Sequence, residues 1–341
     1  MMKTVSVMGF VALLSVLMAV PAMADEPSLG RGSFTVQFEN DRIANTDRHY
    51  THGTRFSWTS EEFEEPPEQA SWLPDAINPF DHDGTWRTAV AIGQNIYTPE
   101  NIGETAMITT DRPYAGWLYA GFSLFNEKRP PDNSTAWDSL NTIELDIGLV
   151  GPQTYAEDVQ TMVHQYINVT RPSGWDHQLK NEPGLALLYE WKLRKRVAKN
   201  PQEFAIDFLP HSGLSVGNVD THAKVGGMIR AGYNVPDDFG PPHIRPSVSG
   251  PGYVDSIKDV GAYFFIGGEK RLVGRNIFLD GNTFADSHSV DKRLIVGDVH
   301  LGAAIILGRV TLAYSYVLRS KEFRGQSESD RFGAFSLSLN L

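Results

Sequence analysis

The strongest constraint on the fold is an alternation of apolar and polar residues that recurs over stretches of about ten residues. The alternation is clearest in residues 141–150, where one parity is apolar: Ile143, Leu145, Ile147 and Leu149. The other parity contains Glu144, Asp146 and Gly148. Successive side chains of a strand point to opposite faces, so this segment predicts a strand with one apolar and one polar face. A soluble sandwich could bury the apolar face, but carboxylates beside a wet lumen suit a membrane barrel equally well.

Strands of this kind can be placed along most of the chain. The expected segments are residues 33–39, 50–59, 85–97, 116–126, 141–150, 185–193, 203–216, 221–233, 261–272, 295–307, 310–318 and 331–341. Short links alternate with long ones such as residues 278–294, and aromatic residues lie near strand ends at Trp58, Trp86, Trp117, Tyr119 and Tyr316. These features predict an all-β fold, a twelve-stranded antiparallel transmembrane β-barrel with aromatic girdles.

The N-terminal segment has the pattern of an export signal. Lys3 is followed by an apolar run over residues 5–20 and by the small-residue sequence Ala22-Met23-Ala24. We therefore expect residues 1–24 to be a cleaved signal peptide and residues 25–341 to form one barrel domain. No later apolar run reaches the roughly 18 residues that a spanning helix needs. The chain contains no cysteine, which is compatible with an exported barrel closed by backbone hydrogen bonds in the bacterial outer membrane.

The net charge of −11 narrows the class of partner. Nucleic-acid binding needs clustered Lys and Arg to contact phosphates, so nucleic acid is excluded as a partner. We expect a monomer whose partners are outer-membrane lipids.

One segment departs from the β pattern, because residues 154–168 predict a short α-helix in an outward-facing loop. Steps of about 100° per residue gather an apolar side: Tyr155, Val159, Met162, Val163 and Tyr166. The opposite side carries Glu157, Gln160 and His164, and the last two are neighbours because they lie four residues apart. Thr154 and Glu157 match a capping box, and Pro172 stops the helix. The simplest interpretation is a surface helix whose polar side contacts water. The alternative is chemistry at His164.

A second polar cluster lies where the first two expected strands meet. Asn40 and Asp41 end the first strand, and their oxygens suit a hard cation such as Ca²⁺. An Asn-Asp pair is also a common turn signal. If both termini are periplasmic, this turn, the 98–115 loop and the His164 helix share the outward end of the barrel. Strand parity groups Thr51 with Arg55, and this predicts that Thr51 points inward, away from lipid.

These motifs, in this order, resemble the outer-membrane lipid A 3′-O-deacylase family. They are Glu39-Asn40-Asp41, Thr-Asp-Arg-His-Tyr-Thr-His-Gly at residues 46–53, Asp-Arg-Pro-Tyr-Ala-Gly at 111–116, and Gln160-x-x-x-His164 followed by Gly174-Trp175-Asp176-x-Gln178-Leu179. The resemblance covers nearly the whole mature chain.

The resemblance implies a twelve-stranded barrel that uses Ca²⁺ to hydrolyse an acyl ester of lipid A, the lipid anchor of lipopolysaccharide, in the outer leaflet. Carried over by position, His164 resembles the general base and Gln160 its neighbour, while Asn40, Asp41 and Thr51 form the opposite wall of the site. Asn40 and Asp41 are the expected metal ligands. Some relatives carry a lysine in the loop after the third strand, whereas Arg112 is the one cation that this sequence offers within residues 98–115.

Other functions are open at this stage. Gly213-Leu214-Ser215-Val216-Gly217 matches the Gly-x-Ser-x-Gly nucleophile elbow, but an elbow needs a strand, a tight turn and then a helix, and this segment is expected at the end of a barrel strand. An outer-membrane phospholipase would hydrolyse glycerophospholipids instead of lipid A. A porin or adhesin barrel would have no need of His164.

Overall fold

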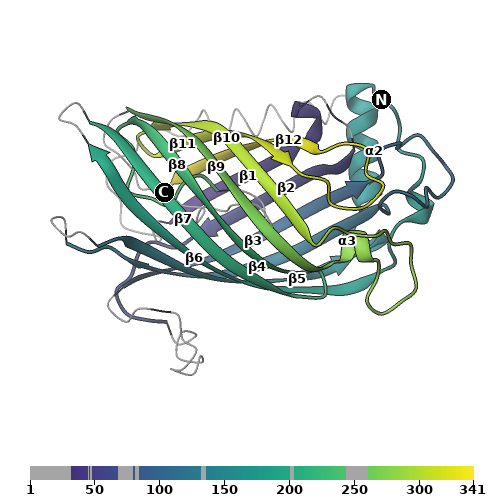
Figure 1. Ribbon diagram of the computed structural model, residues 1–341, viewed down its shortest axis with the longest axis horizontal. Helices are drawn as coiled ribbons and strands as arrows, with labels where there is room; N and C mark the ends of the chain where they lie inside the picture. The colour runs from purple at the N-terminus through teal and green to yellow at the C-terminus, as the bar shows by residue number, and fades with distance from the viewer. Residues whose placement is uncertain are drawn as a thin grey trace. The chain divides into compact units, whose positions relative to one another are not determined.

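Twelve antiparallel strands close into one barrel, as the computed structural model shows (Figure 1). The structure describes residues 32–44, 46, 48–67, 80, 84–131, 136–199, 203–242 and 260–341. The strands are β1 (Ser33–Asn40), β2 (His49–Thr59), β3 (Thr85–Thr98), β4 (Ala115–Lys128), β5 (Asp138–Val150), β6 (Glu182–Lys199), β7 (Phe204–Gly217), β8 (Asp220–Tyr233), β9 (Val260–Asn276), β10 (Ile295–Leu307), β11 (Val310–Arg319) and β12 (Asp330–Asn340). The predicted fold class is therefore confirmed.

Each strand pairs with its neighbours in sequence, and β1 closes the barrel by pairing with β12 from Ser33↔Asn340 to Asn40↔Gly333. Closure pairs each of the described barrel strands on both sides, and a sheet in lipid needs this because its backbone groups cannot bond to water there. The largest difference from the predicted strands is at β6, which extends to Lys199. Its last residues, Arg-Lys-Arg-Val-Ala-Lys, carry no apolar alternation that could have revealed a strand.

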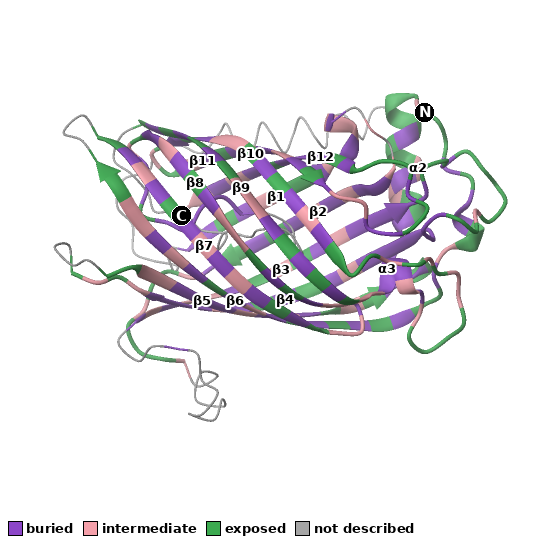
Figure 2. Ribbon diagram, in the orientation of Figure 1, coloured by how far each residue is buried: buried purple, intermediate pink, exposed green. Residues whose placement is uncertain are grey.

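Side chains alternate between a polar interior and an apolar exterior, and Figure 2 shows this as stripes of buried and exposed residues along each strand. On β1, Gln37 and Glu39 are buried while Phe34 and Phe38 are exposed. The aromatic girdle is only partly as expected. Trp58 is exposed, but Trp86 is covered by Phe80, and Trp117 and Tyr119 are buried and stack on each other. Parity, and not closeness to a strand end, decides which way an aromatic ring points.

The links that follow odd-numbered strands lie at one end of the barrel. They carry η1 (Asp41–Ala44), η3 (Pro152–Thr154), α2 (Ala156–Ile167), η4 (Trp175–His177) and α3 (Ile277–Asp280). Figure 1 shows α2 and α3 at the same end. The expected signal peptide at residues 1–24, and Asp47 of the second motif, fall outside the described residues.

The described part of the chain has no helix that is both long enough and apolar enough to span a membrane.

Candidate functional site

Helix α2 begins two residues later than the sequence predicts, and the expected capping box is absent. Thr154 belongs instead to the 3-10 turn that starts at Pro152, and its hydroxyl donates to the carbonyl of Gly151 at 2.7 Å. Tyr155 then becomes the N-cap, with φ 56° and no side-chain cap. At the other end Asn168, also left-handed, caps the helix before Pro172 is reached.

Gln160 and His164 of the polar side of α2 face the barrel, whereas Glu157 of the same side is exposed. Gln160 and His164 are 3% and 2% exposed, whereas Met162 and Tyr166 on the apolar side are 57% and 59% exposed. The interpretation in which the polar side merely contacts water is therefore wrong for Gln160 and His164. Burying an amide and an imidazole costs free energy unless their polar atoms form hydrogen bonds, so the burial of these two side chains points to hydrogen bonding or to a function.

Helix α2 rests on the outer wall of β3 and β4. Ala156 packs with Ile96, Tyr114 and Trp175 in one buried cluster. On the same face of β3 as Ile96, Gln94 donates through Nε2 to the carbonyl of Thr154 at 2.7 Å. The exposed residues of that face, Val90 and Ile92, identify it as the outside of the barrel.

His164 is oriented by a backbone carbonyl. Its Nδ1 lies 2.6 Å from the carbonyl oxygen of Thr170, and because that oxygen can only accept, Nδ1 carries the proton. In the neutral imidazole, Nε2 then has a free lone pair and can act as a base. Gln160 is fixed in turn by Trp175, whose Nε1 donates to Oε1 at 2.8 Å. The buried Nε2 of Gln160 has no hydrogen-bond partner among the described residues and is available to a ligand.

Asn40 and Thr51 are hydrogen-bonded at the turn between β1 and β2, and Asp41 follows Asn40 in the chain. Asn40 donates through Nδ2 to the carbonyl of Thr51 at 2.8 Å and accepts from the backbone N–H of Arg42 at 2.9 Å. The carboxylate of Asp41 is 1% exposed and accepts from the backbone N–H of Arg48 at 2.5 Å.

Thr51 faces outward, contrary to the prediction from parity. The β2–β3 register shifts between Tyr50 and His52, so Thr51 is the extra residue of a bulge and simple alternation fails there. Its hydroxyl is 2.8 Å from that of Thr98, which is two residues beyond Ile96 and hence on the same face of β3. Both halves of the predicted site therefore meet the outer face of β3, with α2 on Ile96 and Thr51 on Thr98.

Ion pairs brace the loops around this turn. His49 contacts Asp330 through Nδ1 at 2.6 Å and Asp111 through Nε2 at 3.4 Å. Burial acts to raise the pKa of Asp111, but hydrogen bonds from His49 and from backbone N–H groups outweigh it and lower that pKa. Arg112 is 0% exposed and donates to Glu322 at 2.7 Å, so it is not placed to contact a lipid phosphate.

Comparison with known proteins assigns the chain to a family. A family model described as "Outer membrane protein LpxR" matches residues 10–341. The chain belongs to the LpxR family. The resemblance to the outer-membrane lipid A 3′-O-deacylases is thereby confirmed, and the protein is placed in the bacterial outer membrane.

Solved structures agree with this assignment at the level of the fold. LpxR from Salmonella typhimurium superposes with a TM-score of 0.72 at 18% identity, covering 91% of this chain and 100% of that one. The β domain of the Bordetella autotransporter BrkA matches at a TM-score of 0.46 with 10% identity, covering 92% of this chain and 100% of that one. The translocator domain of the autotransporter NalP from Neisseria meningitidis matches at a TM-score of 0.42 with 11% identity, covering 100% of both chains. These two values are too low to bear on function. No protein with a curated description matches the sequence significantly.

The donors available for a cation in this LpxR-family site are hard oxygens. Asn40 contributes an amide oxygen and Asp41 a carboxylate, the ligand types that Ca²⁺ prefers. Within the described ranges, no group of three or more His, Cys, Asp or Glu side chains is arranged to hold a metal ion. The residues fit a site in which one carboxylate is completed by backbone carbonyls and by oxygens from outside the protein.

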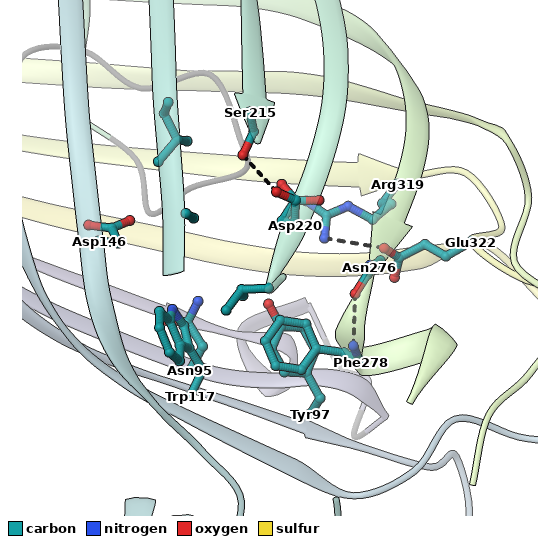
Figure 3. A pocket seen from close by; sticks show the side chains of 13 residues that line it. Asn95, Tyr97, Trp117, Asp146, Ser215, Asp220, Asn276, Phe278, Arg319 and Glu322 are labelled. Atoms are coloured by element: carbon teal, nitrogen blue, oxygen red, sulfur yellow. Dashed lines mark hydrogen bonds and ion pairs between the residues drawn. The ribbon is translucent and has the colours of Figure 1, made fainter. Parts of the chain in front are cut away.

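A separate pocket lies inside the barrel, and none of the five predicted site residues lines it (Figure 3). Ser215 of the Gly-x-Ser-x-Gly sequence does line it, and its hydroxyl donates to the carbonyl of Asp220 at 3.0 Å. Ser215 lies within β7, and the chain continues into β8 and not into a helix. The nucleophile-elbow interpretation therefore lacks its structural context.

Sequence reasoning missed three contributors to the site. Trp175 belonged to one of the motifs but was given no role, and the Thr170 carbonyl leaves no mark in a side-chain pattern. Thr98 was predicted to be the first residue of the 98–115 loop, whereas it ends β3. Each acts through a contact that depends on how the loops fold over β3.

Proposed function

We propose that this protein is a Ca²⁺-dependent lipid A 3′-O-deacylase that removes the ester-linked 3′-acyl chain, with any acyloxy substituent, in the outer leaflet. The observation that carries the proposal is the fixed tautomer of His164, which leaves Nε2 as a base on the buried side of a helix against the outer barrel wall. Membership of the LpxR family supports the substrate class.

The chain's own residues can carry the proton transfers. Nε2 of His164 takes a proton from water as the water oxygen bonds to the ester carbonyl carbon. The carbon–oxygen ester bond then breaks, and His164 returns the proton to the sugar oxygen that leaves. The unpartnered Nε2 of Gln160 can donate a hydrogen bond to substrate, and the Trp175 indole keeps that amide from rotating.

Asn40 and Asp41 would hold the cation. When bound, Ca²⁺ would supply positive charge that stabilises a developing oxyanion and offsets repulsion between an acidic protein and an anionic lipid. Thr51 fixes the adjoining turn through its bond to Thr98 and through its carbonyl, which accepts from Asn40.

Expression in a Gram-negative host without such an activity tests the proposal. Mass spectrometry of lipid A should show loss of a 3′-acyl or acyloxyacyl mass with the native chain and none with His164→Ala. His177→Ala is the matched control, since His177 is an exposed histidine of the neighbouring η4 turn. Purified protein should lose activity on calcium chelation and regain it on addition of Ca²⁺.

Two results would count against this function. Unchanged lipid A with correctly folded protein would defeat it, as would full activity in His164→Ala. Fatty acid release from glycerophospholipids alone would favour the phospholipase alternative.

A further inference from the structure

Most of the apolar side of α2 is exposed, although Val159 packs against the cluster of Ile96, Tyr114, Ala156 and Trp175. Tyr155 and Tyr166 are 66% and 59% exposed, Met162 is 57% exposed, and Val163 and Ile167 are 39% and 44% exposed. In a helix of a water-soluble protein this side would turn to the core, and here it is the polar side that does so. A contiguous exposed apolar surface marks an interaction site.

This surface continues the lipid-facing surface of the barrel. On the outer row of β3, α2 covers Gln94 and Ile96, and the next two residues of that row, Ile92 and Val90, are 56% and 48% exposed. Two residues of a strand advance about 7 Å, so the apolar belt starts at the edge of the helix. On β4 the same row runs from Gly116, beneath Ala156, to the exposed Phe122.

The orientation of α2 also suits a membrane boundary. Figure 1 shows the helix running across the long direction of the barrel and not along it, at the end that carries the site. A helix that lies in the plane of a bilayer, with its apolar side in the acyl region and aromatic rings at the headgroup level, has this arrangement.

We propose that the apolar side of α2 is immersed in the acyl-chain region of the outer leaflet, so that the helix is a membrane-inserted surface and not a loop in water. His164 and Gln160, on the opposite side, then lie between lipid and barrel wall, within lateral reach of an ester at the base of an acyl chain. The position of α2 in the membrane is independent of whether the protein deacylates lipid A.

Single-cysteine labelling tests this directly, because the native chain has no cysteine. Met162→Cys and Tyr166→Cys are labelled with the environment-sensitive fluorophore NBD and reconstituted into phosphatidylethanolamine–phosphatidylglycerol vesicles containing lipids with doxyl groups on their acyl chains. Phe122→Cys, on the lipid-facing side of β4, is the membrane control. Arg324→Cys is the aqueous control, since its side chain is 78% exposed in the loop after β11.

Labels at positions 162 and 166 should show blue-shifted emission and severalfold stronger doxyl quenching than the label at 324, approaching the label at 122. Emission and quenching equal to those at 324 would overturn the proposal. A second copy of the chain could cover the same face instead. Pyrene excimer emission from Met162→Cys without doxyl quenching would show this and would equally reject lipid contact.

Discussion

At the scale of single residues, one backbone carbonyl fixes the tautomer of His164, the proposed base. The carbonyl of Thr170 accepts a hydrogen bond from Nδ1 of His164, so Nε2 of His164 can accept a proton. The indole of Trp175 donates to Oε1 of Gln160, so Nε2 of Gln160 can donate a hydrogen bond. The sequence predicted the pair of residues from their spacing. It could not predict the tautomer, because the carbonyl that sets it lies in a loop whose path follows no periodicity.

Replacing Trp175 by Phe should lower the deacylation rate while leaving the fold intact. The change removes the donor to Gln160 Oε1, and a neutral hydrogen bond contributes about 1 kcal/mol, so a loss of about fivefold is expected. Initial rates on purified lipid A measure the effect. Tyr114→Phe is the matched control: it removes a hydroxyl bonded to the Ile102 carbonyl at 3.0 Å in the same cluster, without touching Gln160. An equal loss in both variants would attribute the effect to packing alone.

At the scale of elements, the question is which side of α2 meets the barrel. The helical period of residues 154–168 was predicted correctly, but amphipathicity gives two sides and not their direction. In water the apolar side of a helix faces the protein, whereas at a lipid boundary the apolar side faces the lipid and the polar side can face the protein. The outward turn of Thr51 has a similar origin, since a single bulge inverts strand parity and leaves no signature in composition.

Close approach of α2 to the wall depends on Gly116. A Cβ at this position would lie 2.0 Å from Thr154 Oγ1 and 2.5 Å from Ala156 Cβ. Gly116→Leu should therefore push α2 off β4 and abolish deacylation, while the barrel still forms and shifts its gel mobility on heating. Ala120→Leu, an exposed residue of the same outward row, should leave activity unchanged. Activity retained in Gly116→Leu would show that the helix need not touch the wall.

At the scale of the whole molecule, buried charge fills the barrel. Arg230 and Asp207 are both 0% exposed and 2.9 Å apart, and Lys224 pairs with Glu190 at 2.7 Å. Arg271 and Asp298 form a further buried pair at 3.2 Å. Alternation of polar and apolar residues predicted a polar interior, but whether that interior is open or filled depends on how pairs from different strands meet.

The filled interior predicts that the protein does not conduct ions as a porin does. In planar bilayers at neutral pH, purified protein should give no stepwise conductance, because buried ion pairs of the described strands occupy the interior where a water-filled channel would run. A known porin from the same membrane preparation provides the control for insertion. Stable single-channel steps would show that the interior is an open channel and would favour the porin alternative.

The amino-acid sequence was enough to predict the twelve-stranded membrane barrel and the position of α2, because strand and helix periods are local properties. The residues proposed for catalysis came from motifs that resemble those of the lipid A 3′-O-deacylase family. Contacts in the folded chain determine which residues of α2 are buried, which tautomer His164 adopts, that Thr51 turns outward and that Arg112 donates to Glu322. Three of these depend on contacts between segments far apart in the chain, and the tautomer of His164 depends on a carbonyl of the irregular loop that follows α2. No local period encodes such contacts.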